Sequence, residues 1–291
     1  LHDLCKQDAA QRQRGWRRRL AGFAATNGQK LAGPRVAWGF GPAEVATCHS
    51  LSRQMEMLMS KQRIRLWDLP TRLFHWLLAG LVVASFVSGK IGGNAMDWHG
   101  KFGLTILGLL AFRLVWGFAG STYARFVSFL PTPAKVLAYL RGQWRGVGHN
   151  PLGAFSVFGL LLLLAFQVGT GLFGNDDIAF RGPLYELIGK DLSDRLTGLH
   201  KLSVNVLIAL VTLHIVAIAF YVRVKKDDLI RPMLTGWKDV APGEGASASG
   251  GGALPLAVAL LVAVATVYGG SGAWLPTPPP PPVSAPATPS W

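Results

Sequence analysis

Four long stretches of this chain carry no acidic residue and almost no basic one, and they restrict its fold more than any other feature. They cover residues 73–89, 99–118, 152–173 and 197–222. Each is close to the twenty or so residues that an α-helix needs to cross a bilayer. Because lipid offers the backbone no hydrogen bonds, such stretches cross it as helices that satisfy their own polar groups. The sequence therefore predicts an all-α integral membrane protein built on a four-helix transmembrane bundle.

A fifth apolar stretch, residues 254–270, is shorter and rich in small residues, and we expect it to be a C-terminal membrane helix. Charged residues make up only 15% of the chain, whereas soluble domains have about a quarter. The net charge of +14 does not indicate a nucleic-acid partner, because the basic residues lie beside the apolar stretches rather than on one basic face. We expect contact with membrane lipid and no nucleic acid.

The charges between the helices predict the orientation. Lys and Arg prevail in residues 61–72, in the connection between helices 2 and 3, and after residue 222, whereas residues 174–196 hold five acids and three bases. Basic loops stay in the cytoplasm. The N-terminus is therefore expected to be cytoplasmic in a bacterial inner membrane, and the loops after helices 1 and 3 to be periplasmic.

The ends of the chain differ from the membrane region. We expect no signal peptide in residues 1–58, since an apolar run and a cleavage site are both lacking there, and Met59 resembles a natural start. Our hypothesis is that they are an upstream translation artefact or a disordered extension, with a small soluble cap as the alternative. Residues 59–240 form the membrane domain and 241–253 a linker. The Pro-rich tail, 271–291, should be extended polyproline II.

Four of the seven histidines lie within the first four membrane segments, where an ionisable residue indicates a functional site. His200 and His214 are fourteen residues apart, which places them on one helix face and about 21 Å apart along the axis. Two ligands at that distance cannot bind one metal, so they predict two centres. Depth pairs His99 with His200 near the periplasmic side, and His75 with His214 near the cytoplasmic side.

Haem fits these pairs better than another metal does. Two imidazoles fill the axial positions of a haem, whereas a zinc site with two histidines needs further Cys, Asp or Glu ligands, which the membrane segments do not offer. The chain has no Cys-x-x-Cys-His, so covalent c-type attachment is excluded. The alternative is that the histidines only form hydrogen bonds between helices.

Two arginines are candidates for contact with haem propionates. Arg113 lies fourteen residues after His99, on the same face of helix 2 and near its cytoplasmic end. The membrane segments contain no carboxylate to pair with it, and guanidinium binds a propionate well. The alternative is an arginine that snorkels to the headgroups. Arg72 is a weaker candidate, since it also fits a positive-inside anchor.

Several motifs together resemble the bacterial cytochrome b561 family, which includes the b-type cytochrome subunits of nickel–iron hydrogenases. They are WDLPTRLFHW (67–76), WHGKFG (98–103), FRLVWGF (112–118), GHNPLG (148–153) and GLHKL…TLHIV (198–216). The resemblance covers residues 62–240. It implies a four-helix core, two non-covalent b haems, electron exchange with membrane quinone, and axial roles for His75, His99, His200 and His214.

These observations predict transmembrane electron transfer through two haem b groups, with quinone as an exchangeable redox partner. The periplasmic partner would be a redox protein such as a hydrogenase or a c-type cytochrome. A cytochrome subunit and a self-standing quinone-linked oxidoreductase are both compatible with the sequence, as are a monomer and a homodimer. The alternative function is a transporter or channel whose histidines relay protons, but the discontinuous helices and inverted repeats typical of that class are not apparent.

Overall fold

The computed structural model describes residues 61–276. The predictions for residues 1–58 and for most of the Pro-rich tail concern residues outside this range. Contacts divide the chain into two units, and the larger one consists of Ile64–Lys238 and Gly245–Trp291. All helices named below belong to the larger unit.

Five helices in the described residues are long and apolar enough to cross a membrane. They are α3 (Leu69–Ile91), α4 (Ala95–Ala119), α7 (Pro151–Gly171), α8 (Lys190–Phe220) and α10 (Ala253–Gly270). A π-helical turn, η2 (Tyr221–Lys225), continues α8. This confirms the predicted all-α membrane fold, including the fifth helix.

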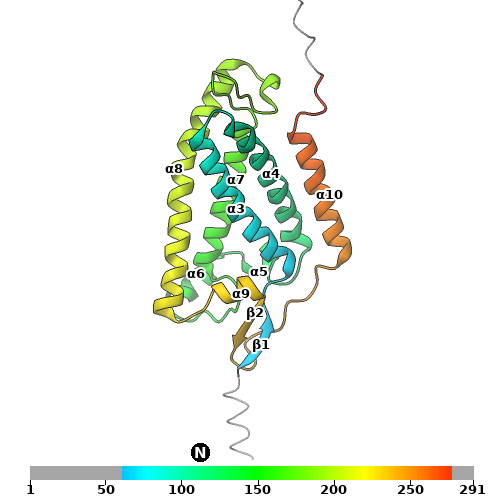
Figure 1. Cartoon of the computed structure of the whole chain (residues 1–291). Coiled ribbons are helices and arrows are strands. Elements are labelled where there is room, and N and C mark those ends of the chain that lie inside the picture. The colour runs from blue at the N-terminus through cyan, green and yellow to red at the C-terminus, as the bar shows by residue number, and fades with distance from the viewer. Residues whose placement is uncertain (1–60, 277–291) are drawn as a thin grey trace, which may run out of the picture. The chain divides into compact units, whose positions relative to one another are not determined.

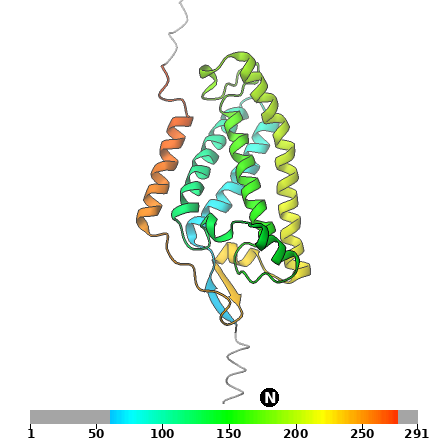
Figure 2. The ribbon, with the colours of Figure 1, turned by 180° about the vertical axis from the view of Figure 1, so that it is seen from behind.

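The first four long helices form two hairpins (Figure 1). Helix α3 packs against α4, α7 packs against α8, and contacts between α4 and α7 join the hairpins. Helix α10 lies along the outside of α4, as both ribbon views show (Figures 1 and 2). We call the end with residues 92–94 and 172–189 the upper end, and the end with residues 120–150, 221–238 and 245–252 the lower end.

Local sequence signals explain where α3 and α7 begin. Asp68 accepts a hydrogen bond from the Thr71 backbone N–H at 2.7 Å and so caps α3. Asn150 caps α7 in the same way, through the Gly153 N–H at 2.7 Å. Each cap precedes a proline in the first turn, where its missing N–H costs nothing. Asn150 and Pro151 thus start α7 just before the predicted stretch 152–173.

Short elements complete the two ends. The lower end holds α5 (Phe126–Phe129), α6 (Pro133–Leu140) and α9 (Ile230–Thr235). Strand β1 (Gln62–Arg65) pairs with β2 (Trp237–Val240), and the 3₁₀ turn η1 (Tyr185–Leu187) lies in the loop at the upper end.

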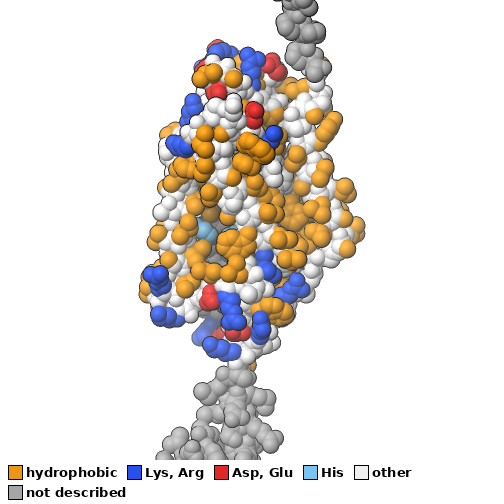
Figure 3. Space-filling view, in the orientation of Figure 1, with side chains coloured by type: hydrophobic (Ala, Val, Ile, Leu, Met, Phe, Trp, Pro, Cys, Tyr) orange, Lys and Arg blue, Asp and Glu red, His pale blue; other side chains and the backbone are white. Residues whose placement is uncertain are grey.

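The surface of the helices is apolar, as contact with a lipid bilayer requires. Large apolar side chains such as Leu162 and Val264 are 74% and 68% exposed. In the space-filling view apolar side chains cover the middle of the molecule, and charged ones gather at its two ends (Figure 3). A soluble domain rarely exposes an apolar surface of this extent, whereas lipid covers it without cost. The buried core is small and lies where α3, α4 and α10 meet, around Phe74, Phe112 and Trp116.

Candidate functional site

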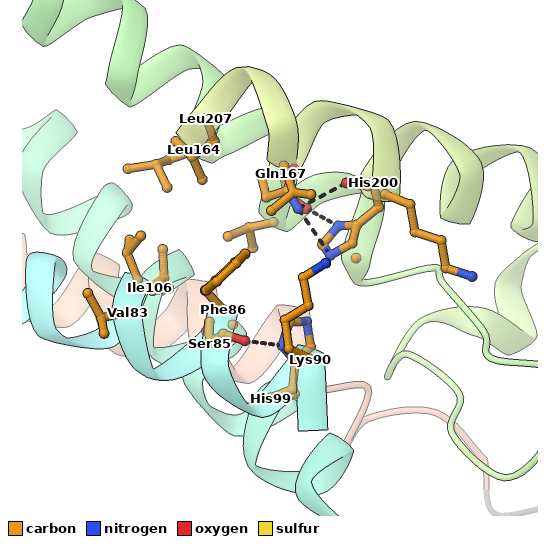
Figure 4. Close-up of a pocket in the computed structure, with 18 of the residues that line it drawn as sticks. Val83, Ser85, Phe86, Lys90, His99, Ile106, Leu164, Gln167, His200 and Leu207 are labelled. Atoms are coloured by element: carbon orange, nitrogen blue, oxygen red, sulfur yellow. Dashed lines mark hydrogen bonds between the residues drawn. The ribbon is translucent and has the colours of Figure 1, made fainter. Parts of the chain in front are cut away.

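A cavity of about 630 Å³ lies between the four helices of the two hairpins (Figure 4). Its walls are mostly aliphatic and come from residues 82–90 of α3, 96–106 of α4, 164–172 of α7 and 200–212 of α8, with two more residues from the upper loop. This volume lies within the range of about 300–1,000 Å³ that cofactor sites have. The cavity is thus bounded mainly by apolar side chains and by few polar groups.

Two of the predicted ligands, His99 and His200, face each other across this cavity. His99 comes from the first turns of α4 and His200 from the upper half of α8. Their ring centroids are 5.9 Å apart, and the ring planes are nearly perpendicular at 85°. The structure therefore brings together the two histidines that sequence depth pairs.

Each of these rings is held through one nitrogen. His99 Nδ1 lies 2.8 Å from the Ser85 carbonyl oxygen, and His200 Nδ1 lies 2.8 Å from the Gln167 carbonyl oxygen. Because a carbonyl only accepts, both Nδ1 atoms must carry the hydrogen. Nε2 then keeps its lone pair, which is the arrangement that histidine ligands of metals adopt.

Gln167 also contacts the other nitrogen of His200, since its Nε2 lies 3.1 Å from His200 Nε2. The Gln167 Oε1 in turn accepts a hydrogen bond from Ser203. The Gln167 side-chain amide thus donates a hydrogen bond to the lone pair of His200 Nε2. A metal bound at His200 Nε2 would replace this hydrogen bond.

Two lysines, Lys90 and Lys201, line the upper part of the cavity, and sequence reasoning missed them. In Figure 4 the Lys90 side chain extends along the cavity toward His200. A lysine at the end of a membrane helix is usually a headgroup anchor, so neither residue gave a signal in the sequence. Placed here, the two ammonium groups can neutralise carboxylates of a cofactor.

The second predicted pair, His75 of α3 and His214 of α8, lies toward the lower end. The two side chains are close enough to interact electrostatically. His214 Nδ1 lies 3.3 Å from Ser156 Oγ of α7. His75 Nδ1 is buried and has no hydrogen-bond partner among the described residues. An unsatisfied buried nitrogen costs free energy, so His75 is better suited to a site that a ligand completes.

Arg113 is buried inside the protein, with 4% of its surface exposed. Its guanidinium lies over the Phe126 ring at 4.5 Å from the centroid, and Nη1 has no hydrogen-bond partner in the described part of the chain. The side chain is therefore enclosed by the protein, with one guanidinium nitrogen left for a further acceptor, as a propionate contact requires.

The sequence predicted no carboxylate near Arg113, and this was wrong, because Asp68 is buried and lies within electrostatic range of Arg113. The Asp68 carboxylate is already hydrogen bonded to Trp116 Nε1 at 3.1 Å, to the Ser121 hydroxyl and to the Thr71 N–H. Asp68 precedes the apolar stretch, so its burial as a helix cap was not visible in hydropathy. Its donors leave Arg113 only partly compensated.

The remaining lower-end candidates have different surroundings. Arg72 donates a hydrogen bond to the Leu234 carbonyl. The Nε atom of Arg72 has no hydrogen-bond partner among the described residues. His149 packs between Trp67 and Phe129 at ring centroid distances of 4.7 and 4.6 Å. Burial, reinforced by the positive charge of Arg113, lowers the pKa of His149 to about 3.

These residues fit haem better than a metal held by protein ligands alone. Among the described residues, no three His, Cys, Asp or Glu side chains gather as a metal-binding group. The upper cavity instead offers two facing imidazoles, one of which has its Nε2 hydrogen bonded to Gln167, together with mostly apolar walls and two cations. Axial imidazoles, a dry pocket and propionate partners are what a b-type haem requires of its protein.

Comparison with known proteins agrees with this chemistry. A family model described as "Prokaryotic cytochrome b561" matches residues 66–236, more than half of the chain. The chain is similar to the probable Ni/Fe-hydrogenase 1 B-type cytochrome subunit of Escherichia coli K12, at 26% identity over 136 residues. That match covers 36% of this chain and 57% of the Escherichia coli protein.

A longer match is to the probable Ni/Fe-hydrogenase B-type cytochrome subunit of Azotobacter vinelandii, at 26% identity over 224 residues. It covers 63% of this chain and 91% of that protein. The corresponding subunit of Rhizobium leguminosarum bv. viciae is 26% identical over 212 residues, which are 60% of this chain and 87% of that protein. No solved structure matches the chain.

Proposed function

This chain belongs to the prokaryotic cytochrome b561 family, and we propose that it carries electrons across a bacterial inner membrane through two non-covalent haem b groups. Membership of the family, together with the hydrogenase cytochrome relatives, supports b-type cytochrome electron transfer. The observation that carries the two-haem proposal is the pairing of four membrane histidines at two depths.

In this proposal His99 and His200 would hold an upper haem, and His75 and His214 would hold a lower haem. The hydrogen bonds from both upper Nδ1 atoms to backbone carbonyls support the first assignment. The unpartnered His75 Nδ1 and its proximity to His214 support the second. Two separate centres let one electron pass from one face of the membrane to the other in a short internal step.

When bound, haem supplies a one-electron couple between Fe(III) and Fe(II). The chain's own residues do the rest. The aliphatic walls exclude water from the upper cavity, Lys90 and Lys201 neutralise carboxylates there, and Arg113 does so at the lower end. These charges and the low dielectric around them set how readily an electron is accepted.

The orientation of the chain in the membrane decides which redox partner each end can contact. The basic flanks lie at the lower end, which we place in the cytoplasm, so the upper end faces the periplasm. We propose that the upper end receives electrons from a periplasmic redox protein, such as a hydrogenase, and that quinone exchanges electrons with the chain. The support is that curated relatives are hydrogenase cytochrome subunits, although the chain spans only 57% of the Escherichia coli relative's length.

Haem content and electron exchange test this function together. The full chain, purified in detergent, should show the visible spectrum of a low-spin b-type cytochrome and release two haems per chain into acidified acetone. After chemical reduction in liposomes, it should be reoxidised by a quinone added to the membrane. A folded, haem-free preparation would contradict the proposal, and a haem-loaded chain that no quinone reoxidises would contradict the quinone assignment alone.

A further inference from the structure

A backbone carbonyl near the upper end of α3 accepts a hydrogen bond from His99. Within the helix, the Ser85 carbonyl points toward residue 89, one turn further on, and this oxygen also lies 2.8 Å from His99 Nδ1. Residue 89 is glycine. A Cβ added there would lie 3.0 Å from His99 Nδ1 and 3.2 Å from Cε1. The glycine thus leaves the space in which the imidazole reaches the carbonyl.

The other hairpin repeats this arrangement on a different sequence. In α7 the Gln167 carbonyl lies 2.8 Å from His200 Nδ1, and the residue one turn later is Gly171. A Cβ on Gly171 would lie 3.0 Å from His200 Cε1 and 3.2 Å from Nδ1. In both hairpins, the residue whose carbonyl accepts the hydrogen bond is followed four positions later by a glycine. In each case the histidine that donates the hydrogen bond lies on the next long helix.

Helix geometry explains why glycine is needed. A carbonyl oxygen has two lone pairs, and one of them bonds the N–H four residues later within the helix. The Ser88 and Thr170 hydroxyls also donate to these two carbonyls, at 3.1 and 3.0 Å. An imidazole reaches the oxygen from the side only where no side chain covers it, and the residue four positions later lies on the same helix face. Glycine at that position uncovers the oxygen, so it can accept a further hydrogen bond from an imidazole.

We infer that Gly89 and Gly171 are positioning residues for the upper haem, which hold His99 and His200 against helix carbonyls. This inference rests on the proposed function, because it assigns both histidines to one haem. The hydrogen bond fixes the Nδ1–H tautomer and aims Nε2 into the cavity. It also raises the basicity of the ligand, which favours Fe(III) over Fe(II).

The same helices offer matched controls. Gly80 in α3 and Gly169 in α7 would meet nothing within 4 Å if a Cβ were added. Gly80→Ala and Gly169→Ala therefore share the backbone effect of replacing glycine in a membrane helix, but they leave both imidazoles untouched. Gly89 and Gly171 also line the cavity, whereas Gly80 and Gly169 do not, so a difference between the two sets of variants reports on the histidine contact and the cavity wall beside it.

The test is a redox titration of Gly89→Ala and Gly171→Ala, combined with low-temperature EPR of the oxidised haems. The added Cβ requires the ring to shift by a few tenths of an ångström, which lengthens the bond to the carbonyl. We expect the midpoint potential of the upper haem to rise and its EPR g values to change. The lower haem should keep its values in both variants, and the control variants should match the wild type.

Three outcomes are distinguishable. If wild-type protein holds no haem, the proposed function fails. If wild type and both test variants hold two haems with identical potentials and EPR signals, the positioning role is wrong and the proposed function stands. If a test variant instead loses haem, the role is supported only when the upper haem is lost and the control on the same helix keeps both haems. Loss in the control as well would indicate a general effect on the helix and overturn the inference.

Discussion

Arg113 is a buried cation whose surroundings among the described residues do not neutralise it. The nearby Asp68 carboxylate is occupied by three donors, and the Phe126 ring contributes only a cation–π contact. Such contacts compensate a buried charge much less than a paired anion does. A haem propionate at the lower end would supply that anion.

Arg113→Leu tests this assignment. A cation near the haem stabilises the reduced state, which carries one more electron, so its removal should lower the midpoint potential of the lower haem. We expect a shift on the order of 60 mV, the equivalent of about a tenfold change for a one-electron couple. The upper haem should not change. Arg113→Lys keeps the charge but lacks the planar fork, and it should retain most of the potential.

The redox titration must resolve both haems in each variant. An unchanged lower potential in Arg113→Leu, with both haems bound, would show that this guanidinium does not contact the haem. A shift in Arg113→Lys as large as that in Arg113→Leu would show that geometry rather than charge matters.

His149 predicts a pH dependence of stability. Burial lowers its pKa to about 3 in the folded protein, whereas the unfolded chain titrates near the ordinary value of 6.5. Below that value the unfolded state binds the proton and the folded state does not, so stability falls as pH falls. The loss is about 1.4 kcal/mol for each pH unit between the two values.

His149→Phe removes this titration while keeping an aromatic ring between Trp67 and Phe129. Thermal unfolding of both proteins in detergent, at about pH 7.5 and about pH 5, measures the effect. The wild type should lose about 2 kcal/mol more than the variant over this interval, since roughly one and a half units lie below the ordinary pKa. Equal losses would mean that His149 titrates normally in the folded state.

At the scale of elements, α10 is attached to the bundle through close packing against α4. A Cβ on Gly108 of α4 would lie 2.7 Å from Val267 Cγ2, and one on Gly270 would lie 2.5 Å from Leu107 Cδ2. Small residues let membrane helices approach in this way. The cavity is lined by residues 82–212, so α10 supports the site only from outside α4.

Gly108→Val should therefore loosen α10 and spare the haems. Overpacking at this contact is expected to cost about 1–3 kcal/mol of stability. Thermal unfolding and haem content, measured on the same preparation, check both parts. Gly159→Val in α7 is the control, since a Cβ there meets nothing within 4 Å. Loss of haem in Gly108→Val but not in the control would show that α10 shapes the haem sites.

Most of the helices could be predicted because apolar length is a local property of the chain. The start of α8 could not: the helix begins at Lys190, before the predicted residue 197, and its first turns are charged. The Lys190–Asp194 ion pair at 2.9 Å lies one turn apart on this extension, and hydropathy does not detect a helix outside the lipid.

For the site, the predicted depth of the two residues in the membrane paired His99 with His200, and the structure brings their rings together. The carbonyl partners Ser85 and Gln167 could not be predicted, since any helix residue has a carbonyl and only the fold shows which one an imidazole reaches. Gly89 had no distinguishing sequence signal either. Its contact with His99 depends on how α3 packs against α4.

At the scale of the whole molecule, the orientation is the prediction that fixes every statement about sides. Reporter fusions test it, because alkaline phosphatase is active only in the periplasm and green fluorescent protein fluoresces in the cytoplasm. A fusion after Gly182, in the upper loop, should be periplasmic, and one after Gly142, at the lower end, should be cytoplasmic. A fusion after Gly272 should match Gly182, because α10 is expected to cross the membrane from the lower end. The reverse pattern would exchange the two sides.

The central claim is that two haems are bound by two pairs of histidines, and single-ligand variants test it most directly. Redox titration and visible spectra of four variants, His75→Ala, His99→Ala, His200→Ala and His214→Ala, should give two classes. His99→Ala and His200→Ala should lose the same haem and retain the other with its wild-type potential, and His75→Ala and His214→Ala should do the opposite. If His99→Ala and His200→Ala affected different haems, or if either retained two haems with wild-type spectra, the pairing proposed here would be wrong.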